Sequence, residues 1–77
     1  LKALSEPIRL RIVALLIAGP QTVGDIAAAL DEDIVKISHH LSVLRNGRIL
    51  SAAKKGRHVE YVLHPEIIQL GSNMLGG

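Results

Sequence analysis

The spacing of apolar residues along this chain changes from one period to another at Gly47. Before that point apolar side chains recur every three or four residues, which is the period of an α-helix, and after it they follow the pattern of short β-strands. The pattern predicts three helices, a hairpin of two strands and a final helix that Pro65 begins. We therefore expect a mostly α fold with a small β-hairpin, in the order helix-helix-helix-strand-strand-helix.

Residues that cap helices mark the first two segments. Ser5 is the expected N-cap of the first helix, because Pro7 suits the first helical turn, and Gly19-Pro20 ends that helix. Thr22 and Asp25 have the spacing of a capping box, with aspartate in place of the usual Glu or Gln. A second, short helix is therefore expected to follow Thr22.

A third helix is expected over residues 34–46, between the polar Asp31-Glu32-Asp33 and Gly47, which we expect to cap its C-terminus. At 100° per residue, its buried stripe consists of Ile34, Ile37, Leu41 and Leu44. The opposite face presents Val35, Lys36, His39, Ser42, Val43 and Asn46, and His40 lies on the flank.

Two short strands are expected next, over residues 49–53 and 58–63. They are joined by Lys54-Lys55-Gly56-Arg57, a hairpin tip that carries three cations. The last helix is expected over residues 65–75, with apolar residues Ile67, Ile68, Leu70, Met74 and Leu75.

The length of 77 residues predicts one domain, residues 1–77, whose ends at Leu1 and Gly76-Gly77 indicate trimming on both sides. A domain this small buries only about 60% of the surface of its unfolded chain. It has no cysteine for a disulfide or a thiolate zinc site. With 48% hydrophobic residues, self-association is the expected source of further stability.

Positive charge is concentrated in one part of the sequence, although the net charge is only +2. Between positions 36 and 59 there are six cations and no acid, whereas the other residues hold three cations and all seven acids. A segregated basic region is typical of a protein that binds a polyanion, and a solvated basic surface is the alternative. The six cations are Lys36, Arg45, Arg48, Lys54, Lys55 and Arg57.

Several functions are disfavoured by what the sequence lacks. Tyr61 is its single aromatic residue, so stacking on exposed bases is not available for RNA-loop or single-strand recognition. It has no cysteine nucleophile, no phosphate-binding glycine loop and no paired carboxylates beside a cleft, so we expect no enzyme. No apolar run approaches the ~20 residues of a membrane span and no signal peptide opens the chain, so we expect a cytoplasmic protein.

The second and third predicted helices, joined by a tight polar turn, have the arrangement of a helix-turn-helix. The major groove of B-DNA, about 12 Å wide, admits one helix whose first turns face the base edges. Lys36 and His39 could donate to guanine or phosphate, Ser42 could donate or accept, and Val35 could contact a thymine methyl. With the basic hairpin as a wing, this pattern predicts a winged helix-turn-helix that binds double-stranded DNA; a winged helix that docks a partner protein is the alternative.

Three stretches resemble the ArsR-type winged-helix repressors. Residues 4–12, LSEPIRLRI, are similar to that family's opening Leu-Ser-Asp-Pro-Thr-Arg-Leu-x-Ile. Residues 37–45, ISHHLSVLR, match its recognition-helix signature Val-Ser-x-His-Leu-x-x-Leu-Arg, and residues 55–61, KGRHVEY, match its wing. The resemblance implies a homodimeric repressor of transcription that releases DNA when an effector binds.

The resemblance also implies roles for individual residues. The recognition helix would contact DNA through Val35, Lys36, Ser38, His39, His40 and Ser42, with His40 near the backbone or packed below the helix. Contacts to the DNA backbone would come from Arg45, Lys54, Lys55 and Arg57. The two-fold interface would contain Leu4, Ile67, Ile68 and Leu70.

Many relatives of this type sense metals, but the sequence does not support their metal sites. Thr22 and Gly24 stand where those relatives carry paired cysteines, and residues 65–75 hold Glu66 without a histidine. His39 and His40 are adjacent and point about 100° apart on a helix, which is poor geometry for chelating one ion. We therefore expect no metal and no cofactor, and the effector and the operator sequence stay open.

Overall fold

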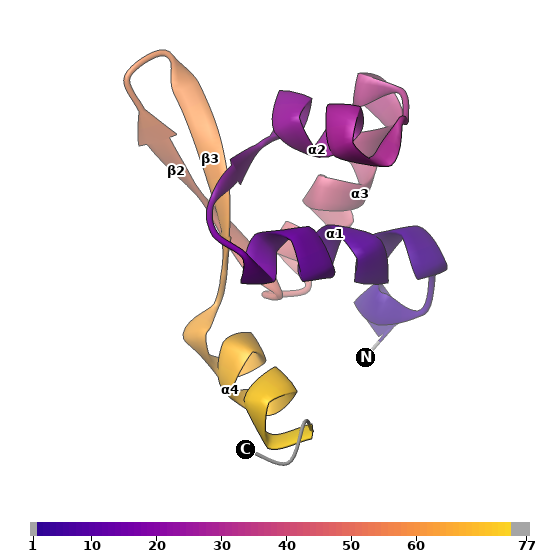
Figure 1. Ribbon diagram of the computed structural model, residues 1–77, viewed down its shortest axis with the longest axis vertical. Helices are drawn as coiled ribbons and strands as arrows, with labels where there is room; N and C mark the ends of the chain where they lie inside the picture. Colours follow the sequence, from indigo (N-terminus) through magenta and orange to yellow (C-terminus); the bar gives the residue numbers. More distant parts are fainter. Residues whose placement is uncertain (1, 75–77) are drawn as a thin grey trace.

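The computed structural model describes residues 2–74 and follows the predicted order of elements with two additions (Figure 1). A 3₁₀ helix, η1 (Lys2–Leu4), precedes the first α-helix, and a two-residue strand, β1 (Gln21–Thr22), precedes the second. The mostly α fold with a hairpin is confirmed, and residue 75, which the sequence assigned to the last helix, lies outside the described residues. The other elements are α1 (Pro7–Ile17), α2 (Val23–Leu30), α3 (Ile34–Asn46), β2 (Leu50–Lys55), β3 (His58–Leu63) and α4 (Pro65–Met74).

The start of α1 differs from the prediction. Glu6, not Ser5, is the N-cap, and no side chain caps the helix there. Because Pro7 is the first helical residue, the residue directly before it is the N-cap by position. The Glu6 carboxylate instead binds Arg9 one turn into the helix, with Oε2 2.6 Å from Nη2.

The capping box at the start of α2 is confirmed. The Asp25 backbone N–H donates to Thr22 Oγ1 and the Thr22 backbone N–H donates to Asp25 Oδ2, each at 3.1 Å. Thr22 also pairs with Glu60 across the short strand pair that β1 makes with β3. One residue therefore caps α2 and joins the sheet, which fixes how the helix pair sits relative to the hairpin.

The sheet has three antiparallel strands in the order β1-β3-β2. The hairpin turn contains only Gly56 and Arg57, so pairing continues to Lys55 opposite His58. Lys54 and Lys55, which the sequence placed in the tip, therefore belong to β2. Gly56 has φ 60°, as two-residue turns that match the twist of their strands require.

The core is aliphatic and is formed by all three N-terminal helices and the hairpin. In α3, three of the four predicted buried residues are correct, but Ile34 is 50% exposed. Ile34 is the first residue of α3, and side chains tilt toward the N-terminus of their helix, so it projects beyond the packed part. His40 takes a buried position instead. The buried apolar residues are Ile12, Leu16, Ile26, Ala27, Ile37, Leu41, Leu44, Ile49, Leu50 and Leu63.

The C-terminus of α3 ends in a Schellman motif, in which Gly47 is the C-cap, as predicted, and the residue after it is left-handed. The Ile49 N–H donates to the Leu44 carbonyl at 2.9 Å, and the Arg48 N–H donates to the Arg45 carbonyl at 3.0 Å. Gly47 is the C-cap but has φ −81°, whereas Arg48 has φ 60°. The left-handed position is thus Arg48.

Gly47 does not have a left-handed backbone conformation. The lack of space for a side chain is what favours glycine at this position. A Cβ added at Gly47 would lie 3.0 Å from the Cβ of Ala3 in η1. The glycine therefore allows η1 to approach the end of α3.

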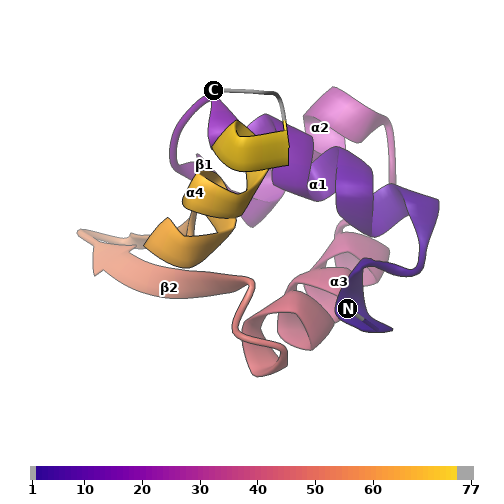
Figure 2. The same cartoon turned by 90° about the horizontal axis from the view of Figure 1, so that it is seen from below.

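The two ends of the molecule carry different elements. In Figure 1 the hairpin tip and α4 lie at opposite ends. Figure 2, seen from below, shows α3 and β2 along one side of the molecule, with α1 and α2 toward the other. The exposed side of α3 and the hairpin therefore belong to one face.

Candidate nucleic-acid interface

The exposed side of α3 carries the residues that the sequence placed at the major groove. Val35 is 74% exposed, and Ser38, His39 and Ser42 are exposed as well. These residues come from the first two and a half turns of α3. They form a surface of small and polar side chains whose size and chemistry suit the base edges of a major groove.

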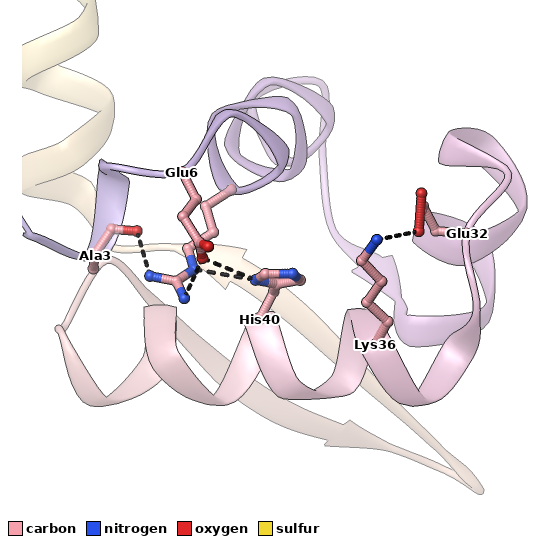
Figure 3. A network of polar contacts seen from close by, with 6 residues as sticks. Ala3, Glu6, Glu32, Lys36 and His40 are labelled. Atoms are coloured by element: carbon pink, nitrogen blue, oxygen red, sulfur yellow. Dashed lines mark hydrogen bonds and ion pairs between the residues drawn. The ribbon is translucent and has the colours of Figure 1, made fainter.

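The N-terminal end of α3 is occupied by the protein's own carboxylates. Asp33 Oδ1 accepts from the backbone N–H of Val35 at 2.7 Å and from that of Lys36 at 3.4 Å. Glu32 Oε2 lies 3.0 Å from the Lys36 ammonium, as Figure 3 shows. Because the positive end of the helix is satisfied internally, it is not free for a phosphate. Glu32 therefore competes with DNA for the Lys36 ammonium.

His40 lies on the buried side of α3 and bonds to α1 (Figure 3). It is 7% exposed, and Arg9 Nε donates to its Nδ1 at 3.1 Å. Arg9 also binds Glu6, and its Nη1 donates to the Ala3 carbonyl at 3.5 Å. Of the two positions expected for His40, near the DNA backbone or packed below the helix, the structure shows the second.

The environment of His40 favours its neutral form. Burial lowers the pKa of His40 below its ordinary value of 6.5, and the Arg9 guanidinium lowers it further, against an opposing contribution from Glu6. Since Nδ1 accepts a hydrogen bond, the neutral ring carries its proton on Nε2. His39 is exposed, and its ring meets that of His40 edge-on, with centroids 5.6 Å apart. His40 therefore positions α3, while His39 faces outward.

The hairpin presents three cations near its end. Lys54, Lys55 and Arg57 are exposed, and none of them forms an ion pair within residues 2–74. Successive residues of a strand point to opposite faces, so Lys54 and Lys55 project from the two sides of the hairpin. Arg45, the fourth predicted backbone contact, is exposed in the last turn of α3.

The residues predicted for a two-fold interface fall into two groups. Leu4 and Ile67 are half-buried against the protein's own core, whereas Ile68 and Leu70 are 51% and 49% exposed on α4. Leu4 and Ile67 therefore pack η1 and α4 against the core. Ile68 and Leu70 are available to a partner.

No cluster of three or more His, Asp or Glu side chains that could hold a metal ion occurs within residues 2–74. None of the helices in this part of the chain is long and apolar enough to cross a membrane.

A protein-family model matches this chain, over a segment that contains all of α3. Residues 6–52 match the family described as bacterial regulatory protein, arsR family. The matched segment runs from the start of α1 through α3 into β2 and includes both Arg9 and His40.

Curated proteins similar to this chain are transcriptional repressors by name. The transcriptional repressor SdpR of Bacillus subtilis (strain 168) is 36% identical over 96% of this chain and 82% of its own length. The arsenical resistance operon repressor of Escherichia coli (strain K12) is 43% identical over 86% of this chain. The chain spans 57% of that second relative.

Solved structures with the same fold include a DNA-binding domain. A homodimeric winged helix-turn-helix DNA-binding domain from Mycobacterium bovis, described as a possible ArsR-family transcriptional regulator, superposes with a TM-score of 0.89 at 28% identity. The alignment covers 96% of this chain and 69% of that one. A possible transcriptional regulator for arsenical resistance superposes with a TM-score of 0.81 at 33% identity, over 97% of this chain and 81% of the other. The fold is therefore a winged helix-turn-helix, as predicted.

Proposed function

The chain belongs to the arsR family of bacterial regulatory proteins, and from that membership we propose that it represses transcription by binding an operator in double-stranded DNA. It binds as a homodimer, in the cytoplasm, and leaves the DNA when an effector binds. The repressors among its relatives and the homodimeric DNA-binding domain with the same fold support this proposal.

One observation carries the proposal. The exposed polar side of α3 and a basic hairpin, whose cations form no ion pairs within residues 2–74, lie on one face. Residues 34–59, from the start of α3 to the hairpin, contain no acidic side chain. DNA presents closely spaced phosphates beside base edges that accept and donate hydrogen bonds, so a surface of this composition complements it.

We assign the contacts in two sets that differ in what they recognise. The exposed side of α3 enters the major groove, with Val35, Ser38, His39 and Ser42 at the base edges and Lys36 at a base or phosphate. The DNA backbone is contacted by Arg45, Lys54, Lys55 and Arg57, which contribute affinity without sequence preference. His40 contributes to DNA binding indirectly, because it holds α3 in position.

The effector does not use the thiolate site of metal-sensing relatives, because the sequence has no cysteine. We propose no catalytic activity for this domain, in keeping with a family of regulatory proteins. The region that responds to an effector is expected to be the surface around α4, because movement there would change the distance between two recognition helices in a dimer.

The experiment that tests this function starts from genomic DNA fragments. The purified protein is mixed with fragmented DNA, and the bound pool is sequenced to obtain a preferred site. Binding to that site and to a scrambled duplex of equal composition is then measured by fluorescence anisotropy at several salt concentrations. We expect preference of at least about 10³-fold for the selected site. Equal affinity for both duplexes, or salt-independent binding, contradicts the proposal and favours docking of a partner protein.

A further inference from the structure

The loop between α3 and β2 contains a backbone conformation that its residue type does not favour. Arg48 occupies the left-handed position of the Schellman motif, with φ 60°. Glycine is usual there, because a Cβ in this conformation crowds the neighbouring carbonyl oxygen. A glycine at position 48 would fit the backbone better, so the fold alone does not explain the arginine. A residue held in such a conformation indicates a role for its side chain.

Arg48 lines an open pocket of about 410 Å³. Arg45 reaches the pocket from the last turn of α3, Ser51 from β2, and His64 from the residue between β3 and α4. Two guanidinium groups beside a hydroxyl supply the planar and point donors that bind phosphate or sulfate oxygens. The other lining residues are Asn46, Leu50 and Ala52.

The charge in this pocket is not balanced by the protein itself. No acidic residue lines it, and within residues 2–74 neither Arg45 nor Arg48 forms an ion pair. Glu66, which follows His64 by two residues, lines a separate pocket on α4. The carbonyls of Leu44 and Arg45, at the negative end of α3, are bonded to the backbone of the loop. An anion in this pocket would therefore meet two cations and few opposing charges.

We propose that Arg45 and Arg48 form an oxyanion site that binds a phosphate group, with Ser51 and His64 as further polar contacts. The site lies where α3 meets β2, on the side of the molecule that carries both (Figure 2). The phosphate is either part of the DNA backbone beside the operator, in which case the site rests on the proposed function, or part of a free small molecule. Both sources present the same chemistry to the two guanidinium groups.

The first experiment measures duplex binding by the wild type, Arg48→Gly and Arg11→Ala between 50 and 200 mM salt. Arg48→Gly removes the guanidinium and gives the left-handed position its preferred residue, so its thermal unfolding midpoint is expected to equal or exceed that of the wild type. Arg11→Ala removes one exposed cation of α1 as a control for net charge. A lost phosphate contact reduces the slope of log K against log[salt] by about 0.9, so the ratio of wild-type to Arg48→Gly affinity should fall by about 3.5-fold over this range.

The second experiment uses the protein without DNA. Inorganic phosphate is titrated at constant ionic strength while backbone amide shifts are followed by NMR. Binding in the pocket predicts saturable shifts at Arg45, Arg48 and Ser51 that Arg11→Ala keeps and Arg48→Gly loses.

The two experiments separate the sources of the phosphate. A reduced salt slope in Arg48→Gly but not in Arg11→Ala identifies the DNA backbone. An unchanged slope with saturable phosphate shifts identifies a free phosphate compound. If Arg48→Gly keeps the wild-type salt slope and inorganic phosphate causes no saturable shifts in the wild type, the site is overturned. If the wild type binds no duplex at all, the proposed function fails, and the phosphate titration alone then decides the site.

Discussion

Arg9 Nε lies 3.1 Å from His40 Nδ1, so a guanidinium on α1 holds the buried side of α3. The same arginine binds Glu6 and the Ala3 carbonyl, and it thereby connects η1, α1 and α3 through one side chain. This contact fixes α3 against the helix that precedes the helix-turn-helix.

Replacing His40 by alanine should lower the free energy of unfolding by about 1–3 kcal/mol, because Arg9 Nε then loses its acceptor in a partly buried position. His40→Asn places an amide oxygen near the position of Nδ1 and should recover part of the loss. Urea unfolding at pH 7.5 measures both. Equal stability of His40→Ala and the wild type would contradict the role of this contact.

The same residue makes stability depend on pH. Because the pKa of folded His40 is lowered from 6.5, the unfolded chain binds a proton at a higher pH than the folded protein does. The contribution of His40 is therefore complete above about pH 6.5 and is lost as the pH falls below it toward the folded pKa. Unfolding free energies at pH 7.5 and 5.5 should differ less in His40→Asn than in the wild type. His58→Asn, a change at a histidine of the hairpin that is not among the groups acting on His40, is the control and should keep the wild-type difference, and equal pH dependence in all three proteins would refute the assignment.

The sequence predicted the elements of this fold well because its signals are local. Thr22 and Asp25 are three residues apart and form the capping box that their spacing indicates. Helical periodicity likewise predicts five of the six residues expected on the exposed face of α3, but Val43 is half-buried. β1 was missed, because a strand of two residues has no periodicity to detect and exists only through pairing with Tyr61 and Glu60.

Features that depend on distant residues could not be read from the sequence. The partner of His40 is 31 residues away, and spacing along α3 placed this histidine on a flank. Gly47 caps α3 as predicted, but the close approach of Ala3 in η1 and the left-handed conformation of Arg48 were not indicated by the sequence. Tertiary packing therefore decided the residues on which local rules failed.

Removal of the three cations of the hairpin should weaken binding to all duplexes alike. In Lys54→Ala/Lys55→Ala/Arg57→Ala, each lost phosphate contact should reduce the slope of log K against log[salt] by about 0.9. Lys54 and Lys55 project from opposite sides of the hairpin and would contact phosphates on either side of it, so loss of all three proposed contacts should reduce the slope by about 2.7. The control is Lys2→Ala/Arg11→Ala, which removes charge from η1 and α1. An unchanged slope in the triple variant would show that the hairpin does not contact DNA.

Ile68 and Leu70, which are exposed apolar residues of α4, should be needed for the dimer. Each fully buried Ile or Leu contributes about 1.5–3 kcal/mol, and every substitution acts twice across a two-fold axis. Ile68→Glu and Leu70→Glu should therefore each weaken association by more than about 100-fold. Val59→Glu, at an exposed apolar residue of the hairpin, is the control. Sedimentation equilibrium should give twice the chain mass of 8.3 kDa for the wild type and the control. A monomeric wild type at micromolar concentration would count against the interface.

Removal of His39 or Lys36 should change the sequence preference of DNA binding, whereas removal of the hairpin cations should change affinity alone. A side chain that bonds to a base edge contributes about 1–3 kcal/mol of discrimination, whereas a phosphate contact contributes affinity alone. His39→Ala is therefore expected to relax the preference at one operator position, and Lys36→Ala to do so at a neighbouring one. Because Glu32 competes for the Lys36 ammonium and repels phosphates, Glu32→Gln should strengthen binding to every duplex and sharpen the preference at the position that Lys36 contacts. The measurement is a competition assay over single-base operator variants, with His58→Ala on the hairpin as the matched histidine control. If His39→Ala kept the wild-type preference at every position, α3 would not read bases through His39, and Val35, Ser38 and Ser42 would be left to account for any sequence preference.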